Sequence, residues 1–471
     1  MIPTLDMDLA RDDDDNILIT GPLGLLEEKL ENGEAIVCVV GLGYVGLPIA
    51  ISYAGKGYRT CGIDLDIERV LKLNTGTSCI QDVSTAEVKK AVDDDLFEAY
   101  DHFSPVADAD VIYICVPTPV TAHKDPDTSY ITSATTSIAP YLRAGQLVIL
   151  KSTTFPNTTE DLVLPILNES AKENGLVVGE DFAVAFSPER IDPGKQQYHT
   201  ENTPIIVGGV TRAFTEVAAI AIGKIVSEVF KVSSPRVAEM TKLLENIFRS
   251  VNIALANELA RLCDRMGDLS MWEVVEAAKS KPFGFMPFYP GPGLGGHCIP
   301  IDPYYLSWLA RKYDFETSFI TLSARVNEEM PFYVAAAVMR VIASQPVALE
   351  EANVLILGVA FKRDVDDTRH SPALRICEIL RDSGVKRLSY SDPHVPELRI
   401  DSRNGAENFK SIDLTEETVR DHDVVVIVTD HTAFPYEMIV EHATHIVDTR
   451  NALKNIPHDR RKVSLLGGGR F

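Results

Sequence analysis

Three glycines, Gly41, Gly43 and Gly46, follow the apolar run AIVCVV in a Gly-x-Gly-x-x-Gly pattern and precede the segment LPIA. Glycines at this spacing permit a tight turn from a strand into a helix, a close approach of the backbone to a pyrophosphate, and close packing of the helix. The amino end of that helix attracts an anion. The motif therefore predicts a strand, a turn and a helix that open a dinucleotide-binding domain, with Tyr44 and Val45 in the turn. The alternative is that the glycines serve helix packing alone.

Asp64 ends the next predicted strand, eighteen residues beyond Gly46. A carboxylate at this place accepts a hydrogen bond from the ribose 2′-hydroxyl and repels a 2′-phosphate, so the sequence favours NAD over NADP. Arg69 follows closely in the sequence. It would either pair with a 2′-phosphate or flank the adenosine of NAD, and the residues alone leave both open.

Apolar runs separated by amphipathic segments are typical of a parallel sheet that helices cover on both faces. After RTCGID, the candidate strands are DVIYICV (110–116), QLVILKS (146–152) and DFAVAFS (181–187). The pattern restarts at Asn353 with NVLILGVAF, RLSYSD, DVVVIVTD and THIVDTR. We therefore expect an α/β fold with two Rossmann-like, doubly wound parallel sheets.

Between Pro235 and Gly267, apolar residues recur every three or four positions, which predicts one long amphipathic helix. A helix of this length commonly joins two domains or forms a dimer seam. We expect an acidic leader with a short helix at 1–34 and the NAD-binding domain at 35–232. A central domain at 233–345 would carry the long helix, a Gly/Pro-rich loop (283–303) and a dimer contact. A second α/β domain would occupy 346–471.

Composition narrows the functions of the chain, which has 45 Lys and Arg, 68 Asp and Glu, and a formal net charge of −23. A surface this acidic argues against nucleic acids and anionic membranes as partners. The scattered cysteines show neither a CxxC pair nor zinc-ligand spacing, which indicates reduced thiols in a cytoplasm and no metal site. The uncharged stretch 35–55 contains glycines and Pro48, so we expect no membrane helix there.

Two threonines follow predicted parallel strands, at the sheet edge where ligands of such folds bind. Thr118 lies in CysValProThrPro (115–119) and Thr153 in LysSerThrThr (151–154). Each would meet the cofactor or simply cap its own loop.

Cys298 lies in GlyGlyHisCys, on a loop rather than in an apolar strand. Its surroundings resemble those of a nucleophile, because His297 is adjacent and the glycines permit close approach, although an isolated loop cysteine is more often inert. On the long helix, Lys242, Asn246 and Arg249 are spaced four and three apart and would share one face. They would supply donors to an oxyanion and to a phosphate or carboxylate, or form a solvated polar stripe.

Two carboxylates complete this candidate site. Glu189 lies in PheSerProGluArg (186–190) at the end of a predicted strand, and Asp302 follows Cys298 by four residues.

From about residue 35 onward, the chain resembles the UDP-glucose/GDP-mannose dehydrogenases, a family of nucleotide-sugar 6-dehydrogenases. It carries a series of motifs of this family in the family's order. The matching segments are GLGYVGLP, VPTP, KST, SPERIDPG, KLLEN, GGHCIPIDP, FKRDVDDTRHSP and VDTRN. The resemblance implies a four-electron oxidation of a sugar C6 alcohol to a carboxylate, with two NAD consumed. It also implies that the domain at 346–471 binds the UDP-sugar and that the product enters polysaccharide biosynthesis.

The resemblance also implies roles for individual residues. Cys298 would capture the aldehyde as a thiohemiacetal and carry the thioester that water hydrolyses. Lys242 and Asn246 would hold the oxyanion, Glu189 and Asp302 would be the acid/base carboxylates, and Thr153 would hold the water. The remaining expected substrate contacts are Arg190, Ile191, Arg249, Phe288, Tyr289, Gly291, Gly295, Phe361, Lys362 and Arg450, with Arg369 near the cofactor phosphates.

The motif SerProGluArgIle indicates the branch of the family. At this place the UDP-glucose enzymes have a motif similar to AsnProGluPheLeu followed by a second Glu, and this chain lacks that second carboxylate. Arg190 and Arg249 instead resemble the enzymes that act on UDP-N-acetylhexosamines (GlcNAc or ManNAc). UDP-glucose 6-dehydrogenase is the alternative enzyme. A two-electron β-hydroxyacid dehydrogenase needs neither the thiol nor a second α/β domain, and a non-catalytic NAD-binding regulator would not need the set Lys242, Cys298 and Glu189.

Overall fold

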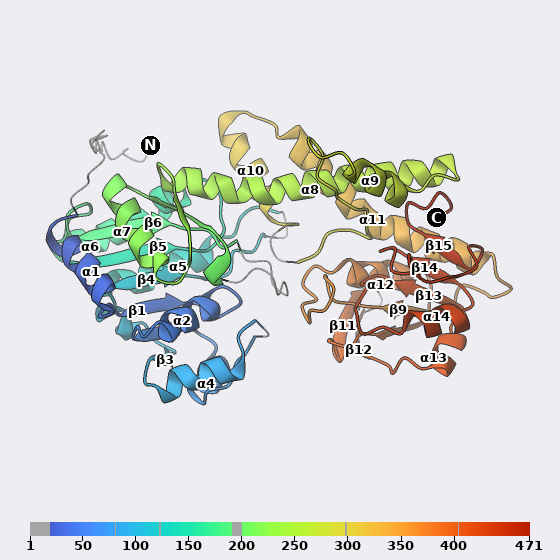
Figure 1. Cartoon of the computed structure of the whole chain (residues 1–471), viewed down its shortest axis with the longest axis horizontal. Helices are drawn as coiled ribbons and strands as arrows, with labels where there is room; N and C mark the ends of the chain where they lie inside the picture. Colours follow the sequence, from blue (N-terminus) through green and yellow to red (C-terminus); the bar gives the residue numbers. More distant parts are fainter. Residues whose placement is uncertain (1–18, 81, 122–123, 191–199, 297–298, 404) are drawn as a thin grey trace. The chain divides into compact units, whose positions relative to one another are not determined.

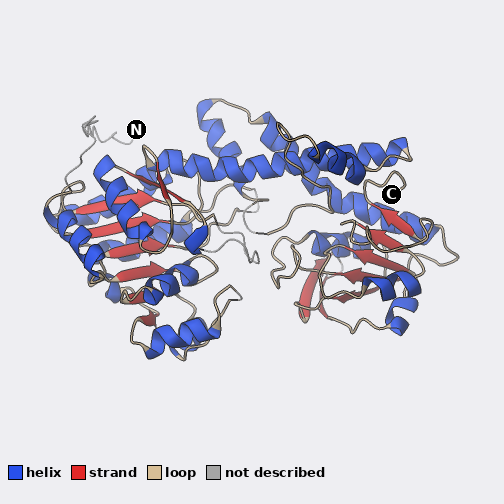
Figure 2. Ribbon diagram, viewed as in Figure 1, coloured by secondary structure: helices blue, strands red, loops and turns tan. Residues whose placement is uncertain are grey.

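The computed structural model describes residues 19–80, 82–121, 124–190, 200–296, 299–403 and 405–471. The chain forms two compact units, Met1–Leu244 and Glu245–Phe471, and the division falls within helix α8 (Pro235–Met266). In each unit, helices lie on both faces of a sheet (Figures 1 and 2).

The described part of the first unit contains an eight-stranded sheet in the order β3-β2-β1-β4-β5-β6-β7-β8. Strands β1 to β6 are parallel, β7 is antiparallel to β6, and β8 is parallel to β7. The order of the first six strands is that of a Rossmann fold, with its switch point between β1 and β4. The strands are β1 (Val37–Val40), β2 (Thr60–Ile63), β3 (Phe97–Tyr100), β4 (Val111–Ile114), β5 (Gln146–Leu150), β6 (Phe182–Phe186), β7 (Ile205–Gly209) and β8 (Val229–Lys231).

Successive side chains of a strand point to opposite faces of the sheet, so the apolar core of this unit has two layers. Val37 and Val39 pack with α1, α2, α3, α4 and α7, whereas Cys38 and Val40 pack with α5 and α6. The helices are α1 (Gly21–Asn32), α2 (Gly46–Gly55), α3 (Ile67–Asn74), α4 (Thr85–Asp93), α5 (Ser129–Ile138), α6 (Leu164–Glu173) and α7 (Arg212–Gly223). Short turns of helix are η1 (Ser104–Ala107), η2 (Ala139–Tyr141), η3 (Thr159–Val163) and η4 (Thr200–Asn202).

Helix α8 confirms the long helix expected between Pro235 and Gly267. Proline is tolerated at its first position because the amide there has no partner within the helix. Gly267 follows Met266 with a φ of 74°, the left-handed conformation that commonly ends a helix.

The described part of the second unit contains a five-stranded parallel sheet in the order β10-β9-β13-β14-β15. Numbered within this sheet alone, the strand order is 2-1-3-4-5, so its switch point lies between β9 and β13. The strands are β9 (Asn353–Leu357), β10 (Arg387–Ser391), β13 (Val424–Ile427), β14 (Ile446–Asp448) and β15 (Val463–Leu465), with an antiparallel pair β11 (Glu397–Ser402) and β12 (Gly405–Lys410).

Helices α11 and α12 cover one face of this second sheet, and α13 and α14 cover the other. The unit also contains α9 and α10, which flank the Gly/Pro-rich loop. Their bounds are α9 (Met271–Lys279), α10 (Asp302–Ala310), η5 (Arg311–Tyr313), α11 (Ser318–Ala343), α12 (Pro372–Asp382), α13 (Glu416–Arg420) and α14 (Tyr436–His442).

The α/β fold with two Rossmann-like parallel sheets is therefore confirmed. The sequence pattern did not predict β3, β7, β8, β15 or the β11–β12 pair. Strands β3, β8 and β15 are short and β11 and β12 are largely polar, whereas β7 is a buried apolar strand that ends in two glycines. None of the helices in the described ranges combines the length and hydrophobicity needed to cross a bilayer.

Candidate active site

The glycine loop after β1 leaves space beside the amino end of α2. Gly41 has a φ of 93°, and a Cβ there would lie 2.6 Å from the carbonyl oxygen of Cys115. A Cβ at Gly46 would lie 1.8 Å from the carbonyl oxygen of Gly41, so both glycines are required by packing. A Cβ at Gly43 would meet no described atom within 4 Å. The loop is thus closed on its protein side and open at Gly43, as a pyrophosphate requires.

Helix α2 begins without a side-chain hydrogen bond at its N-cap among the described residues, and the amide of Leu47, its second residue, donates to the Gly43 carbonyl at 3.1 Å. Tyr44 and Val45 are half-buried in the turn before it. The residues around this turn therefore fit a dinucleotide.

Asp64 connects the glycine loop to Arg69. Its Oδ2 accepts hydrogen bonds from the Leu42 amide and from Arg69 Nη1, both at 2.8 Å, and its Oδ1 accepts one from the Asp66 amide at 3.0 Å. Burial opposes the charge of Arg69, but the hydrogen bond to Asp64 and the negative charges of Asp64 and Asp66 together outweigh it and raise the pKa of Arg69. Arg69 is thereby held beside the carboxylate expected to select the cofactor.

A buried lysine lies where β5 ends, beside Glu189 at the end of β6. Lys151 is 4% exposed, and its Nζ donates to the Pro188 carbonyl at 3.1 Å and to Ser187 Oγ at 3.5 Å. The same Nζ lies 3.7 Å from Glu189 Oε2. Glu189 Oε1 accepts from the Arg190 amide at 2.7 Å. Glu189 was predicted from the sequence as a site residue, but Lys151 was not. A lysine that directly follows an apolar strand is a signal for a buried cation.

The two threonines differ in their surroundings. Thr118 is buried after β4, whereas Thr153 is half-buried in the segment after β5. Arg190 donates from Nη1 to the carbonyl of Pro204 at 2.9 Å. Ile191 lies outside the described residues.

Glu239, one turn before Lys242 on α8, is a buried carboxylate that the sequence analysis also missed. It accepts hydrogen bonds from the Asn157 amide at 2.7 Å, the Thr159 amide at 2.9 Å and Thr159 Oγ1 at 2.7 Å. Burial raises the pKa of Glu239 to about 7, and these hydrogen bonds oppose the rise. Glu239 thus anchors the segment that follows Thr153 to the helix that carries Lys242.

Lys242 and Asn246 are both buried, at 8% and 7% exposure, whereas Arg249 is exposed. Asn246 Nδ2 donates to Asp302 Oδ2 at 2.5 Å. Asp302 is 2% exposed and is the first residue of α10. Residues 56 positions apart are therefore joined by a short, buried hydrogen bond.

The Gly/Pro-rich loop lies against the carboxyl end of the second sheet. A Cβ at Gly291 would lie 2.9 Å from Arg450 Nη1, and one at Gly295 would lie 2.7 Å from Phe361 Cβ. Arg450 donates from Nε to the Val428 carbonyl at 3.0 Å, and burial lowers its pKa to about 10. Two expected substrate residues, Phe361 and Arg450, are thus brought to one loop.

Further contacts hold this loop. The Gly296 amide donates to the Arg369 carbonyl at 2.9 Å, while the Arg369 side chain is paired with Asp367. The Gly291 amide donates to Asn257 Oδ1 at 2.9 Å. Lys362 is half-buried.

Phe288 and Tyr289 pack on neighbouring helices. Phe288 meets Phe248 edge to face, with ring centroids 5.7 Å apart. Tyr289 stacks on Trp272 at 5.6 Å and donates to Glu276 at 2.5 Å.

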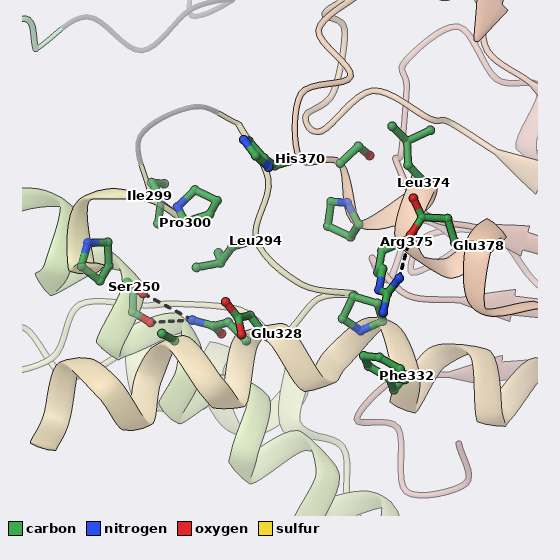
Figure 3. A pocket seen from close by; sticks show the side chains of 16 residues that line it. Ser250, Leu294, Ile299, Pro300, Glu328, Phe332, His370, Leu374, Arg375 and Glu378 are labelled. Carbon is green, nitrogen blue, oxygen red and sulfur yellow. Dashed lines mark hydrogen bonds and ion pairs between the residues drawn. The ribbon is translucent and has the colours of Figure 1, made fainter. Parts of the chain in front are cut away.

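A cavity of about 520 Å³ borders the loop within the second unit (Figure 3). Leu294, Ile299 and Pro300 line it, and they flank positions 297 and 298 in the sequence. Arg375 also lines it and is paired with Glu378 at 2.7 Å. Cys298, the expected nucleophile, lies outside the described residues.

Comparison with protein families agrees with this architecture. Three models of the UDP-glucose/GDP-mannose dehydrogenase family match the chain: the NAD binding domain at 35–231, the central domain at 236–329 and the UDP binding domain at 355–455. The chain belongs to the UDP-glucose/GDP-mannose dehydrogenase family. It is an NAD-dependent oxidoreductase, and the fit of the Gly43 turn to a dinucleotide agrees with that cofactor.

Relatives within the family are similar over most of the chain. UDP-N-acetyl-D-mannosamine dehydrogenase of Pyrococcus horikoshii is 36% identical over 89% of this chain and 96% of its own. UDP-N-acetyl-D-glucosamine 6-dehydrogenase of Pseudomonas aeruginosa is 35% identical over 76% of this chain and 83% of its own. A solved structure of UDP-D-ManNAc dehydrogenase from Pyrococcus horikoshii matches with a TM-score of 0.82 and 33% identity, covering 93% of this chain and 100% of the other.

Proposed function

We propose that this enzyme oxidises the C6 hydroxyl of a UDP-N-acetylhexosamine, UDP-GlcNAc or UDP-ManNAc, to the uronate. The observation that carries this substrate class is the similarity, at 35 to 36% identity, to relatives named for those two sugars. UDP-glucose is the second candidate substrate, and a UDP-glucose dehydrogenase structure is similar at 26% identity and a TM-score of 0.78. The lower identity favours the N-acetylated sugars.

Cofactor binding in this proposal rests on the first unit. The turn of Gly41, Gly43 and Gly46 would hold the pyrophosphate. Asp64, with Arg69 beside it, would accept a hydrogen bond from the ribose hydroxyl. When bound, NAD accepts a hydride from C6 in each of the two oxidations. The other residues proposed to bind NAD are Tyr44, Val45, Thr118, Thr153 and Arg369.

The remaining catalytic steps are assigned to side chains of this protein. Cys298 adds its sulfur to the aldehyde carbon and later carries the acyl group as a thioester, which water cleaves to the acid and the thiol. Lys242 and Asn246 donate to the oxyanion, and the contact of Asn246 with Asp302 supports this role because it orients the amide. Glu189 and Asp302 act as the acid/base carboxylates, and Thr153 holds the attacking water.

Substrate binding is assigned to the residues that match substrate contacts of the family. Phe361 and Arg450 are supported by their positions beside Gly295 and Gly291. The further proposed contacts are Arg190, Ile191, Arg249, Phe288, Tyr289 and Lys362.

The experiment is a substrate panel with NADH absorbance as the readout. UDP-GlcNAc, UDP-ManNAc and UDP-glucose are each incubated with enzyme and NAD, and the NADH formed per sugar acid is counted. The proposal expects two NADH per acid and faster turnover of an N-acetylated sugar. A preference for UDP-glucose would reject the substrate class, and one NADH per product would reject the four-electron reaction.

We also propose that the enzyme is a cytoplasmic homodimer that pairs through α8. Large apolar side chains are exposed along this helix at spacings of three, four or seven residues, and apolar surface of this extent marks an interface. They are Val237, Met240, Leu244, Phe248, Leu255, Leu259, Leu262 and Met266. Light scattering should give twice the chain mass, and Leu255→Glu with Leu262→Glu should give the monomer. A monomeric unaltered protein would refute the pairing.

A further inference from the structure

A buried histidine joins two strands' ends in the second unit. His431 is fully buried after β13, and its Nδ1 accepts a hydrogen bond from the Asp364 amide at 2.9 Å. Its Nε2 lies 3.0 Å from Asp392 Oδ2. An amide can only donate, so Nδ1 is the unprotonated nitrogen, and Nε2 carries the proton and donates it to Asp392.

Asp364, whose amide binds His431, is the last residue of segment 359–364. Asp392, directly after β10, binds the first residues of that segment. Its Oδ2 also accepts from the amides of Val359 at 2.7 Å and Ala360 at 3.2 Å. Burial disfavours the charge of Asp392, but the hydrogen bond from His431 and those from backbone amides outweigh it, so the pKa of Asp392 is lowered. Segment 359–364 is therefore tied at both ends to one imidazole and carboxylate pair.

The middle of this segment carries Phe361 and Lys362. It follows β9, at the switch point between β9 and β13, where ligands of such sheets bind. Phe361 also lies against Gly295 of the Gly/Pro-rich loop. The position of His431 thus controls a segment that borders the proposed sugar-nucleotide site.

Asp364, His394 and His431 also have the composition of a metal site, with possible ligand atoms within 4.8 Å of one another. The contacts disfavour a metal. The lone pair of His431 Nδ1 is already used by the Asp364 amide, and Asp364 accepts hydrogen bonds from the amide and hydroxyl of Thr432. His394 Nε2 is buried without a hydrogen-bond partner among the described residues, but it lies 3.8 Å from Asp364 Oδ1.

We propose that His431 is a positioning residue for the sugar nucleotide, because it clamps segment 359–364 through Asp364 and Asp392 and so holds Phe361 and Lys362 in place. This inference rests on the proposed function, which assigns those two residues to the substrate. His431 itself touches neither the substrate nor the cofactor in this scheme.

The test uses variants that retain one hydrogen bond each. His431→Asn keeps an acceptor near the position of Nδ1, His431→Gln keeps a donor near the position of Nε2, and His431→Phe keeps only the ring shape. The dissociation constant of UDP is measured by calorimetry on the full chain. We expect His431→Phe to raise it about 5- to 150-fold, because the Phe361 and Lys362 side chains, no longer held by the clamp, must be ordered when UDP binds, with smaller increases for the other two. His445→Gln, a half-buried histidine outside the clamp, is the control.

Kinetic constants separate positioning from general damage. The KM for the UDP-sugar should rise in the His431 variants, while kcat at saturation and the KM for NAD stay within about twofold. Hydrogen exchange of the Val359, Ala360 and Asp364 amides should accelerate in the same variants and not in His445→Gln.

Three outcomes would overturn the inference: UDP affinity unchanged in His431→Phe, equal losses of UDP and NAD affinity, or stoichiometric Zn²⁺ binding that His431→Phe abolishes. If the unaltered protein binds no UDP, the proposed function fails and the positioning role fails with it. The exchange of the three amides still decides, independently, whether His431 clamps the segment.

Discussion

Lys151 places its buried Nζ 3.7 Å from Oε2 of Glu189, across the ends of two adjacent parallel strands. A buried ammonium is stable only where acceptors surround it, and here the Pro188 carbonyl and Ser187 hydroxyl complete its partners. Glu189 is 15% exposed at its side chain, so it faces the cation on one side and solvent on the other. The pair supplies the proposed acid/base carboxylate with a fixed counter-ion.

Replacement of Lys151 by Met should lower kcat by about tenfold or more, because the positioned acid/base contributes at least that much. Stopped-assay NADH formation measures this effect.

Lys151→Arg keeps the charge and should retain most of the activity, and Lys172→Met, on the exposed face of α6, should have no effect. An unaltered kcat in Lys151→Met would show that the lysine serves only packing.

Glu239 should make local stability depend on pH. Its folded-state pKa of about 7 lies above the ordinary value of 4.5, so its protonation stabilises the folded state fully below pH 4.5. This stabilisation is lost as the pH rises towards 7, and the loss amounts to about 3 kcal/mol. Hydrogen exchange of the Thr159 amide should report an opening free energy that falls between pH 5 and pH 8. In Glu239→Gln, that fall should vanish, and an identical fall in both proteins would rule out Glu239 as its source.

Asp64→Ala should erode the preference for NAD. The substitution removes the acceptor for the ribose hydroxyl and leaves Arg69 without the partner that it has at 2.8 Å. A guanidinium in that position attracts a 2′-phosphate, so the ratio of kcat/KM for NAD to that for NADP should fall about tenfold or more. Adding Arg69→Ala should remove the gain with NADP. Equal efficiency of the unaltered enzyme with both cofactors would refute the role of Asp64.

Cys298→Ser should stall the proposed reaction after the second oxidation. The serine hydroxyl ionises far less readily than a thiol, whose usual pKa is about 8.5, and its ester hydrolyses more slowly than a thioester. Turnover should fall by orders of magnitude, and mass spectrometry should detect an acyl adduct on residue 298. Cys298→Ala is the matched variant without a nucleophile, and wild-type turnover to the acid in that variant would exclude the covalent route.

The features of this protein that depend on neighbouring residues were predictable from the amino-acid sequence. The turn at Gly41, Gly43 and Gly46 and the length of α8 follow from local spacing and periodicity, and both are confirmed. The strands that form the centre of each sheet were also predictable, because they are continuously apolar. Short strands such as β3 and β8 were not, since they carry little apolar signal and are held by their neighbours.

Only the tertiary structure decided which distant polar groups meet. Glu239 binds Thr159 across 80 positions, Asn246 binds Asp302 across 56, and His431 binds Asp364 across 67. Such contacts depend on strand order and on how each helix faces its sheet, and neither is encoded in local spacing. Once folding removes these groups from water, each must find a partner or cost free energy, so burial selects the pairs that the linear sequence leaves open.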